Sequence, residues 1–166
     1  MRTLYLDCFS GIAGDMMLAS LVHAGADREY IENELKKIRI EPFTLAWKTV
    51  VKQGVTALKL DVLTEQSDHS HHHRHYADIV DLIQDTDFND NVKRISLAIF
   101  AKIGAAEAKI HNIPLEKVHF HEVGAIDSIV DTIGVALALD TLQIERIVSS
   151  NIPLGSGQVK CDHGIY

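Results

Sequence analysis

The sequence predicts an α/β fold in which helices pack on a mixed sheet, with the strand order left open. Three observations support this class: an apolar strand followed by a glycine turn and a helix near the start, an alternating β-hairpin, and several stretches with apolar residues at helical spacing. A chain of 166 residues with 46% hydrophobic and 23% charged residues is long enough for one sizeable core, so residues 1–166 are expected to form a single domain.

The first unit is a strand, a tight turn and a helix. Residues 3–9 are apolar and β-forming, and Ser10, Gly11 and Gly14 follow before a helical pattern starts at Asp15. Such a turn can present amide groups to an anion such as phosphate, although it lacks the third glycine of a dinucleotide fingerprint and the lysine of a Walker loop. Asp15 is expected to cap the helix or to hold a metal. Asp7 lies at a strand end, where open α/β sheets bind ligands.

The later elements follow from the same two periodicities. Apolar positions three and four apart predict helices, and alternation of apolar and polar residues predicts strands. Met16 and Ile110 are among the residues assigned to buried helix faces. The predicted elements are a helix over 28–37, a hairpin of strands 44–51 and 55–62, a helix from Tyr76, a longer helix from Val92 that ends before Asn112, a helix carrying Asp127 and Asp131, and a strand over 146–150.

Residues 65–75 contain five histidines within seven positions and no apolar side chain. Such a composition cannot pack into a core, so a mobile loop is expected. The segment is internal and interrupted by Ser70 and Arg74, which is unlike a purification tag. Neutral imidazoles suit nickel, zinc and copper, and the composition does not select among these metals. The candidate ligands are His69, His71, His72, His73 and His75.

A second histidine group lies in residues 118–131. His119 and His121 alternate, so an extended backbone directs both imidazoles to one face. Asp127 and Asp131 follow one helical turn apart, where like charges repel unless a cation or a hydrogen-bond donor lies between them. The alternative is that the aspartates form a solvated helix face and that the histidines are partly buried and bonded to backbone carbonyls.

Charge and cysteine content exclude several classes of protein. The net charge of −7 and the lack of a basic cluster argue against nucleic-acid binding and favour cations as partners. Cys8 and Cys161 are too few for a disulfide scaffold, and no signal peptide or membrane-spanning run is recognisable. A reduced, cytoplasmic protein without a membrane partner is therefore expected. The chain stops at Tyr166 without a capped element, which indicates an N-terminal part of a longer protein.

Four blocks in this order resemble the LarC family of nickel insertion proteins: residues 7–16, 65–79, 119–131 and 151–164. The resemblance implies a nickel chelatase of the lyase class. It implies that nickel(II) is placed into pyridinium-3,5-bisthiocarboxylic acid mononucleotide in a CTP-dependent reaction, which yields the nickel-pincer nucleotide of lactate racemase. It also implies a C-terminal domain, or a separate C-terminal chain, that handles CTP with a divalent cation. Homo-oligomer formation and the roles of Cys161 and His163 are left open.

Two kinds of site are therefore expected. The histidines of 65–75 capture nickel, and a transfer site comprises His119, His121, Glu122, Asp127 and Asp131, with Asp7 and Asp15 alongside. Ser10, Gly11 and Gly14 are the candidate cradle for the phosphate of the mononucleotide. Two alternatives use the same residues: a metal-dependent phosphoester hydrolase with its metal at the central group, and a nickel storage or carrier protein without catalysis.

Overall fold

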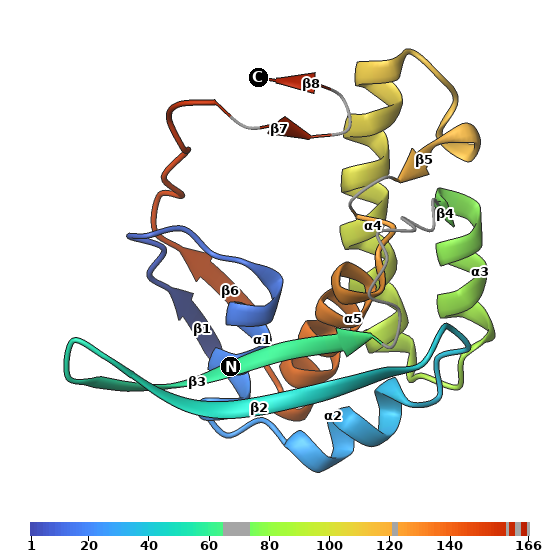
Figure 1. The fold of residues 1–166 in the computed structure, drawn as a ribbon. Coiled ribbons are helices and arrows are strands. Elements are labelled where there is room, and N and C mark those ends of the chain that lie inside the picture. The colour runs from blue at the N-terminus through green and yellow to red at the C-terminus, as the bar shows by residue number, and fades with distance from the viewer. Residues whose placement is uncertain (65–73, 121–122, 159, 162–163, 166) are drawn as a thin grey trace.

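The computed structural model describes residues 1–64, 74–120, 123–158, 160–161 and 164–165. The predicted α/β class is confirmed (Figure 1). The elements are β1 (Thr3–Leu6), α1 (Gly14–His23), α2 (Arg28–Leu35), β2 (Phe43–Lys52), β3 (Val55–Thr64), β4 (Arg74–His75), α3 (Tyr76–Asp85), α4 (Asp90–His111), a 3-10 turn (Leu115–Lys117), β5 (His119–Phe120), α5 (Ile126–Thr141), β6 (Arg146–Ser149), β7 (Lys160–Cys161) and β8 (Gly164–Ile165).

The strands form separate two-stranded sheets instead of one mixed sheet. β1 and β6 are parallel, and the pairs β2–β3, β4–β5 and β7–β8 are antiparallel. The long β2–β3 hairpin is the predicted one. Gln53 and Gly54 at its turn have φ of 50° and 80°, the left-handed pair of a two-residue hairpin loop whose twist matches the strands. This turn sets the register of the whole hairpin, from Lys52↔Val55 to Phe43↔Thr64.

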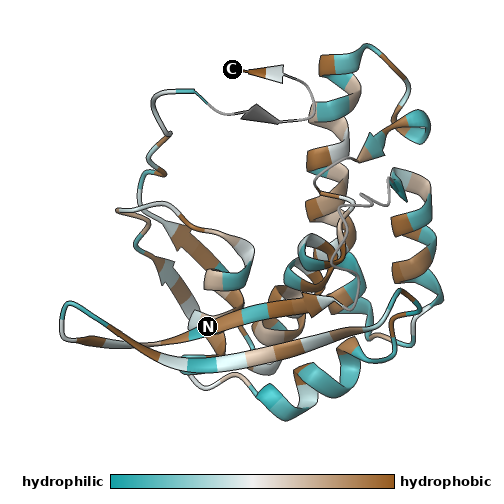
Figure 2. Ribbon diagram, in the orientation of Figure 1, coloured by the Kyte–Doolittle hydropathy of each residue, from teal (hydrophilic) through white to brown (hydrophobic). Residues whose placement is uncertain are grey.

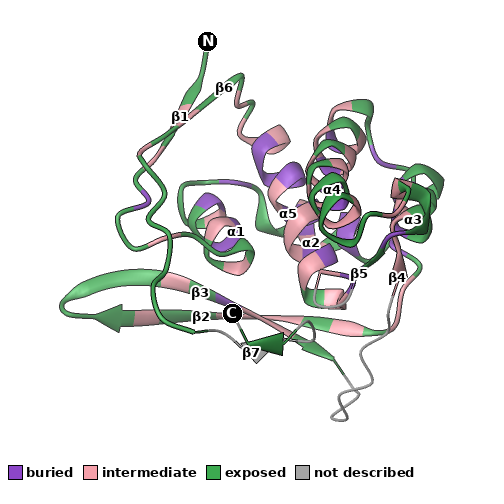
Figure 3. Cartoon of the chain, turned by 90° about the horizontal axis from the view of Figure 1, so that it is seen from above, coloured by how far each residue is buried: buried purple, intermediate pink, exposed green. Residues whose placement is uncertain are grey.

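Helix α5 is the centre of the core. The helix predicted to carry Asp127 and Asp131 is confirmed, and its apolar residues at helical spacing, Ile129, Val130, Ile133 and Leu137, are fully buried. Figure 3 shows buried residues gathered on α5 and on the neighbouring helices. Figure 2 shows α5 as hydrophobic along much of its length, whereas α2 carries a hydrophilic outer face. Helix α5 is therefore the inner helix of the fold, and the exposed Asp127 in its first turn belongs to a helix that is otherwise largely buried.

Close packing of α1 on α5 depends on Gly134. A Cβ at this position would lie 2.5 Å from Leu18 Cδ2, far inside van der Waals contact. The two helix axes can therefore approach only where α5 has no side chain. This approach positions the first turn of α1 against the first turns of α5.

The assignments of Met16, Ala106 and Ile110 to buried helix faces are wrong, because all three residues are exposed. Met16 is 52% exposed and Ile110 is 75% exposed. Met16 lies in the first turn of α1, beyond the part of the helix that packs on the core, and Ile110 lies in the last turn of α4. No helix within the described ranges combines the length and the apolar character that a membrane crossing needs.

Candidate functional site

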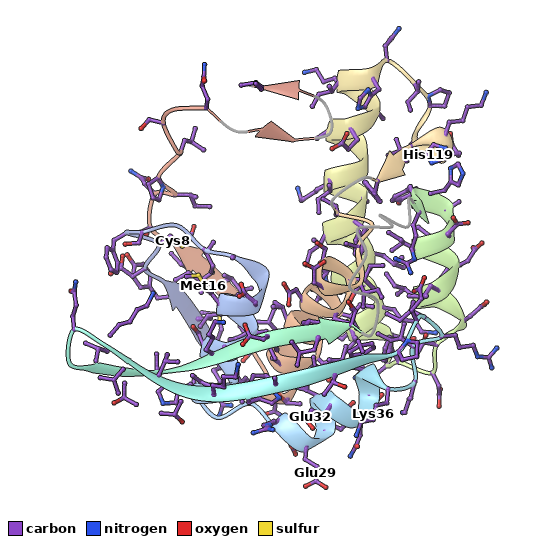
Figure 4. All side chains as sticks on the ribbon, viewed as in Figure 1. Cys8, Met16, Glu29, Glu32, Lys36 and His119 are labelled. Atoms are coloured by element: carbon purple, nitrogen blue, oxygen red, sulfur yellow. The ribbon has the colours of Figure 1, made fainter. Side chains whose placement is uncertain are left out.

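The turn that leads into α1 is fixed at the carboxyl end of the parallel pair β1–β6. The Cys8 N–H donates to Ser150 Oγ at 2.8 Å, which ties the end of β1 to the end of β6. The Gly11 N–H then donates to the Cys8 carbonyl at 2.9 Å, and Gly11 has φ of 83°, a conformation that favours glycine. Figure 4 shows Cys8 in this region, with Met16 in the first turn of α1. These hydrogen bonds therefore fix the position at which the chain enters α1.

Helix α1 begins without a side-chain cap. The N-cap residue of α1 is Ala13, whose backbone is extended. The prediction that Asp15 is the capping residue of this helix is therefore wrong. Asp15 lies in the first turn, and its Oδ1 accepts from the Met16 N–H at 2.8 Å. The first turn of α5 repeats this arrangement, because its N-cap is Ala125 and Asp127 Oδ1 accepts from Ser128 N–H at 2.7 Å. Each carboxylate thus satisfies an amide of its own helix N-terminus.

Asp131 lies directly against the start of α1. A Cβ on Gly14 would be 2.7 Å from Asp131 Cβ and 2.8 Å from its Oδ2, so only glycine leaves room for this carboxyl group. The carboxyl group accepts a hydrogen bond from the backbone of Asp15. Asp131 Oδ1 is buried and has no hydrogen-bond partner among the described residues. A buried oxygen in this state is an acceptor available to a cation or to a proton.

Burial raises the pKa of Asp131 from 3.8 to about 7, and the charges of Asp15 and Asp127 contribute further to the rise. The sequence-based expectation that Asp127 and Asp131 repel each other is consistent with this shift. The hydrogen bond from Asp15 acts in the opposite direction but does not offset the burial. Near neutral pH, the carboxyl group of Asp131 therefore exchanges a proton readily.

This arrangement bears on the predicted phosphate cradle. Ser10 is exposed and Gly11 has open space around it. The amides of Asp15 and Met16, however, already donate to carboxylates. A phosphate at this helix start would meet negative charge, so the site suits a phosphate only together with a bridging cation.

The second part of the site is a contact between two histidines. Strands β4 and β5 pair His75 with His119, and their ring centroids are 3.5 Å apart with the ring planes inclined at 48°. His75 is half-buried and His119 is exposed. Figure 4 shows the His119 side chain at the outside of the molecule. The last histidine of the predicted capture segment therefore touches the first histidine of the central stretch.

Neighbouring contacts hold this histidine pair in place. Arg74 Nη1 donates to the Gly124 carbonyl at 2.5 Å, and its Nη2 forms an ion pair with Glu41. A Cβ on Gly124 would lie 2.8 Å from the Phe120 carbonyl oxygen, so the chain can fold back tightly only at a glycine. Phe120 itself is buried, with the Tyr76 ring edge-on to it at 6.2 Å. The backbone that carries the two histidines is therefore held by packed neighbouring side chains.

Several predicted site residues are not placed by these observations. Asp7 is exposed at the end of β1, and it is not among the charges that shift the pKa of Asp131. The described parts of the chain contain no group of three or more His, Cys, Asp or Glu residues arranged to hold a metal ion. His69, His71, His72, His73, His121, Glu122 and His163 lie outside the described residues, as does the side chain of Cys161.

Sequence reasoning missed two features of the site. Arg74 was noted only as an interruption of the histidine segment, yet it bonds to a carbonyl 50 positions away. The His75 and His119 contact was also missed, because each strand has only two residues and shows no periodicity. One signal in the sequence could have suggested this contact. An extended backbone could be expected at His75, which directly precedes a helical pattern, and also at His119.

Comparison with known proteins gives a consistent result. The model of the family described as "Nickel insertion protein" matches residues 4–166. A protein of Geobacillus kaustophilus is 52% identical over 100% of this chain and 42% of its own length. Proteins of Staphylococcus epidermidis and Akkermansia muciniphila are 49% and 44% identical, each over 99% of this chain and 41% and 42% of their own lengths. All three are named pyridinium-3,5-bisthiocarboxylic acid mononucleotide nickel insertion protein. No solved structure matches.

Proposed function

The chain belongs to the nickel insertion protein family, and from this premise we propose that it is the nickel-handling part of a protein that inserts nickel(II) into pyridinium-3,5-bisthiocarboxylic acid mononucleotide. The observation that carries the proposal is the match over residues 4–166, together with relatives that bear this name at 42–52% identity. The chain spans about 42% of the length of these relatives. The product in this proposal is the nickel-pincer nucleotide.

Nickel is the cargo of this reaction, so its ligands must acquire the ion and then release it. Imidazoles with a few carboxylates meet both demands, whereas a set of four thiolates would compete with the two thiocarboxylates of the substrate. We assign capture to His69, His71, His72, His73 and His75. We assign transfer to His119, His121, Glu122, Asp127 and Asp131, near Asp15. Asp7 remains a candidate for the same site.

The carboxyl cluster of Asp15, Asp127 and Asp131 serves the nucleotide in this proposal. The turn at Ser10, Gly11 and Gly14 would hold the mononucleotide phosphate, and a divalent cation that arrives with the phosphate would meet the unpartnered Oδ1 of Asp131, because the three carboxyl groups alone are not arranged to hold a metal ion. The cation would supply charge neutralisation between phosphate and carboxylates. The chain's own residues orient the phosphate and hold a proton on Asp131 while the cation is absent.

We further propose that the reaction depends on CTP with a divalent cation. These are assigned to the remaining part of the longer relatives, either in the same polypeptide or as a separate C-terminal chain. Residues 1–166 then form the N-terminal domain of the whole. We assign the reaction to the cytoplasm, because thiocarboxylates and the buried free thiol of Cys8 suit a reducing compartment.

The proposal is tested by reconstitution. The chain is combined with the C-terminal part of a relative, CTP, magnesium, nickel(II) and the thiolated mononucleotide, and the nickel-bearing product is measured by mass spectrometry. His121→Ala should abolish product formation while nickel capture by the isolated chain stays nearly unchanged, because capture uses the histidines of 65–75. Full product formation by His121→Ala would show that the central stretch is scaffold.

Two other functions have less support. A phosphoester hydrolase would use the same central residues to hold a resident metal, and the relatives reported above are named for nickel insertion and not for hydrolysis. A nickel storage or carrier protein would bind the ion but give no product in the reconstitution. The same experiment therefore separates insertion from storage, and release of phosphate from a model phosphoester would identify a hydrolase.

A further inference from the structure

His75 and His119 occupy the closest kind of cross-strand position. The Tyr76 N–H donates to the Val118 carbonyl at 3.0 Å, which makes His75 and His119 a pair without hydrogen bonds between their own backbones. Side chains in such pairs come nearer to each other than in hydrogen-bonded pairs. The ring centroids at 3.5 Å are the result. Strand pairing thus brings together histidines that the sequence assigns to two different stretches.

We propose that His75 and His119 bind one nickel(II) ion between them, as the point at which captured nickel is handed to the substrate. This inference rests on the proposed function for the identity of the ion. Metal–imidazole bonds of about 2.1 Å, the length known from zinc sites, place two neighbouring donor nitrogens about 3 Å apart. Rings whose centroids are already 3.5 Å apart can reach this spacing through a change of side-chain orientation, without a shift of the two strands.

The backbone beneath the two histidines is already ordered. Val118 and Phe120, on either side of His119, are buried at 0% and 1% exposure. On the other strand, the His75 N–H donates to Asp78 Oδ2 at 3.0 Å at the start of α3. Ligands on such a base lose little further freedom when they bind an ion, which favours binding at a defined place.

A site with two protein ligands also fits a handover. Nickel(II) with nitrogen donors favours square-planar or tetragonal coordination, so two imidazoles leave at least two positions open. The named substrate of the relatives carries two thiocarboxylates. When both sulfurs bind as thiocarboxylate anions, two nickel–nitrogen bonds break and two nickel–sulfur bonds form. No electron is transferred in this exchange, and no proton is required.

The competing explanation of the His75 and His119 contact is that the two rings only pack against each other at the start of α3. Two substitutions separate it from a metal site. His119→Phe keeps an aromatic ring and removes both nitrogens, whereas His75→Asn keeps a good N-cap residue and removes the imidazole. His23→Gln, in the last turn of α1, is the control for loss of an exposed histidine.

The variants are made in the full 166-residue chain, both with its natural sequence and with His69, His71, His72 and His73 replaced by alanine. Nickel(II) alone is titrated in competition with a chromophoric chelator, and thermal unfolding is followed in parallel. In the alanine background we expect one bound ion, which His119→Phe and His75→Asn each abolish and His23→Gln retains. In the natural sequence, each substitution and the double variant should lower the stoichiometry by the same one ion.

Retention of this ion by His119→Phe would show that the contact is only a packing contact and would overturn the inference. Loss of one ion in each single variant and of two in the double variant would also overturn it, because the histidines would then bind separately. Failure here leaves the proposed function standing if the reconstitution still yields the nickel-bearing nucleotide. Nickel binding at the pair without any product would refute the proposed function and not the site.

Discussion

Replacing Asp131 by asparagine should stabilise the chain above neutral pH. The folded chain holds the Asp131 pKa at about 7, against 3.8 for the ordinary group. Below pH 3.8 the carboxyl group is protonated in both the folded and the unfolded chain, so it adds no pH dependence. Between pH 3.8 and 7 the unfolded chain releases the proton and the folded chain retains it, so stability falls as pH rises. Above pH 7 the loss is complete.

The size of the effect follows from the same interval. At about 1.36 kcal/mol for each pKa unit, the shift corresponds to at most about 4 kcal/mol. The side chain is only part-buried, so solvent screening reduces the expected gain for Asp131→Asn to about 1–2 kcal/mol at pH 8. The melting temperature should then rise by about 2–8 °C. Asparagine can still accept the hydrogen bond from Asp15, so the contact with α1 is kept.

The assay is thermal or urea unfolding of both chains from pH 3.5 to pH 8. Asp81→Asn, an exposed position on α3, is the matched control, since it changes the net charge of −7 by the same amount. The two stability curves should coincide near pH 3.5 and separate steadily up to pH 7, while the control stays parallel to the natural chain. A difference that does not vary with pH would refute the reasoning, as would an asparagine variant that is less stable at pH 8.

Two further substitutions test the packing of α1 on α5 and the capping of α2. Gly134→Ala should destabilise the fold by about 1–3 kcal/mol in denaturant unfolding, because its Cβ would lie 2.5 Å from Leu18 Cδ2. Gly155→Ala, where a Cβ meets nothing within 4 Å, is its control and should change stability little. Asp27→Ala should cost about 1 kcal/mol, because the Asp27 side chain accepts from the Tyr30 N–H at 3.0 Å at the start of α2. Asp27→Asn should retain most of that stability, and equal losses in the two variants would contradict a capping role.

The sequence predicted those parts of the fold whose signals are local. The α5 stripe from Ile129 to Leu137 repeats over several turns, and the hairpin turn at Gln53 and Gly54 lies between two long alternating strands. The close packing of α1 on α5 could not be foreseen in the same way. It depends on the contact between Gly134 and Leu18, and no sequence pattern around either residue predicts a contact with the other.

The candidate site was predictable in its residue types and not in its geometry. Asp127 and Asp131 are one turn apart on a helix, so their repulsion could be inferred from spacing. The contact of Asp131 with Gly14 and the contact of His75 with His119 join stretches that are far apart in the chain. The first contact depends on how α1 packs on α5. The second depends on the pairing of two strands of two residues each, which are too short to show a periodic sequence pattern.

The parallel pair β1–β6 should be the first part of the described structure to open. Parallel strands in α/β proteins are normally covered on both faces, yet Tyr5 is 62% exposed and Ile147 is 48% exposed. Amide protons of this pair should therefore exchange with solvent by local opening, well before those of the buried α5. Because the end of β1 is tied to the end of β6 at Cys8 and Ser150, each opening also loosens the turn that starts α1. The buried Oδ1 of Asp131, which lies against the start of α1, would then meet solvent in short, repeated intervals while the core stays folded.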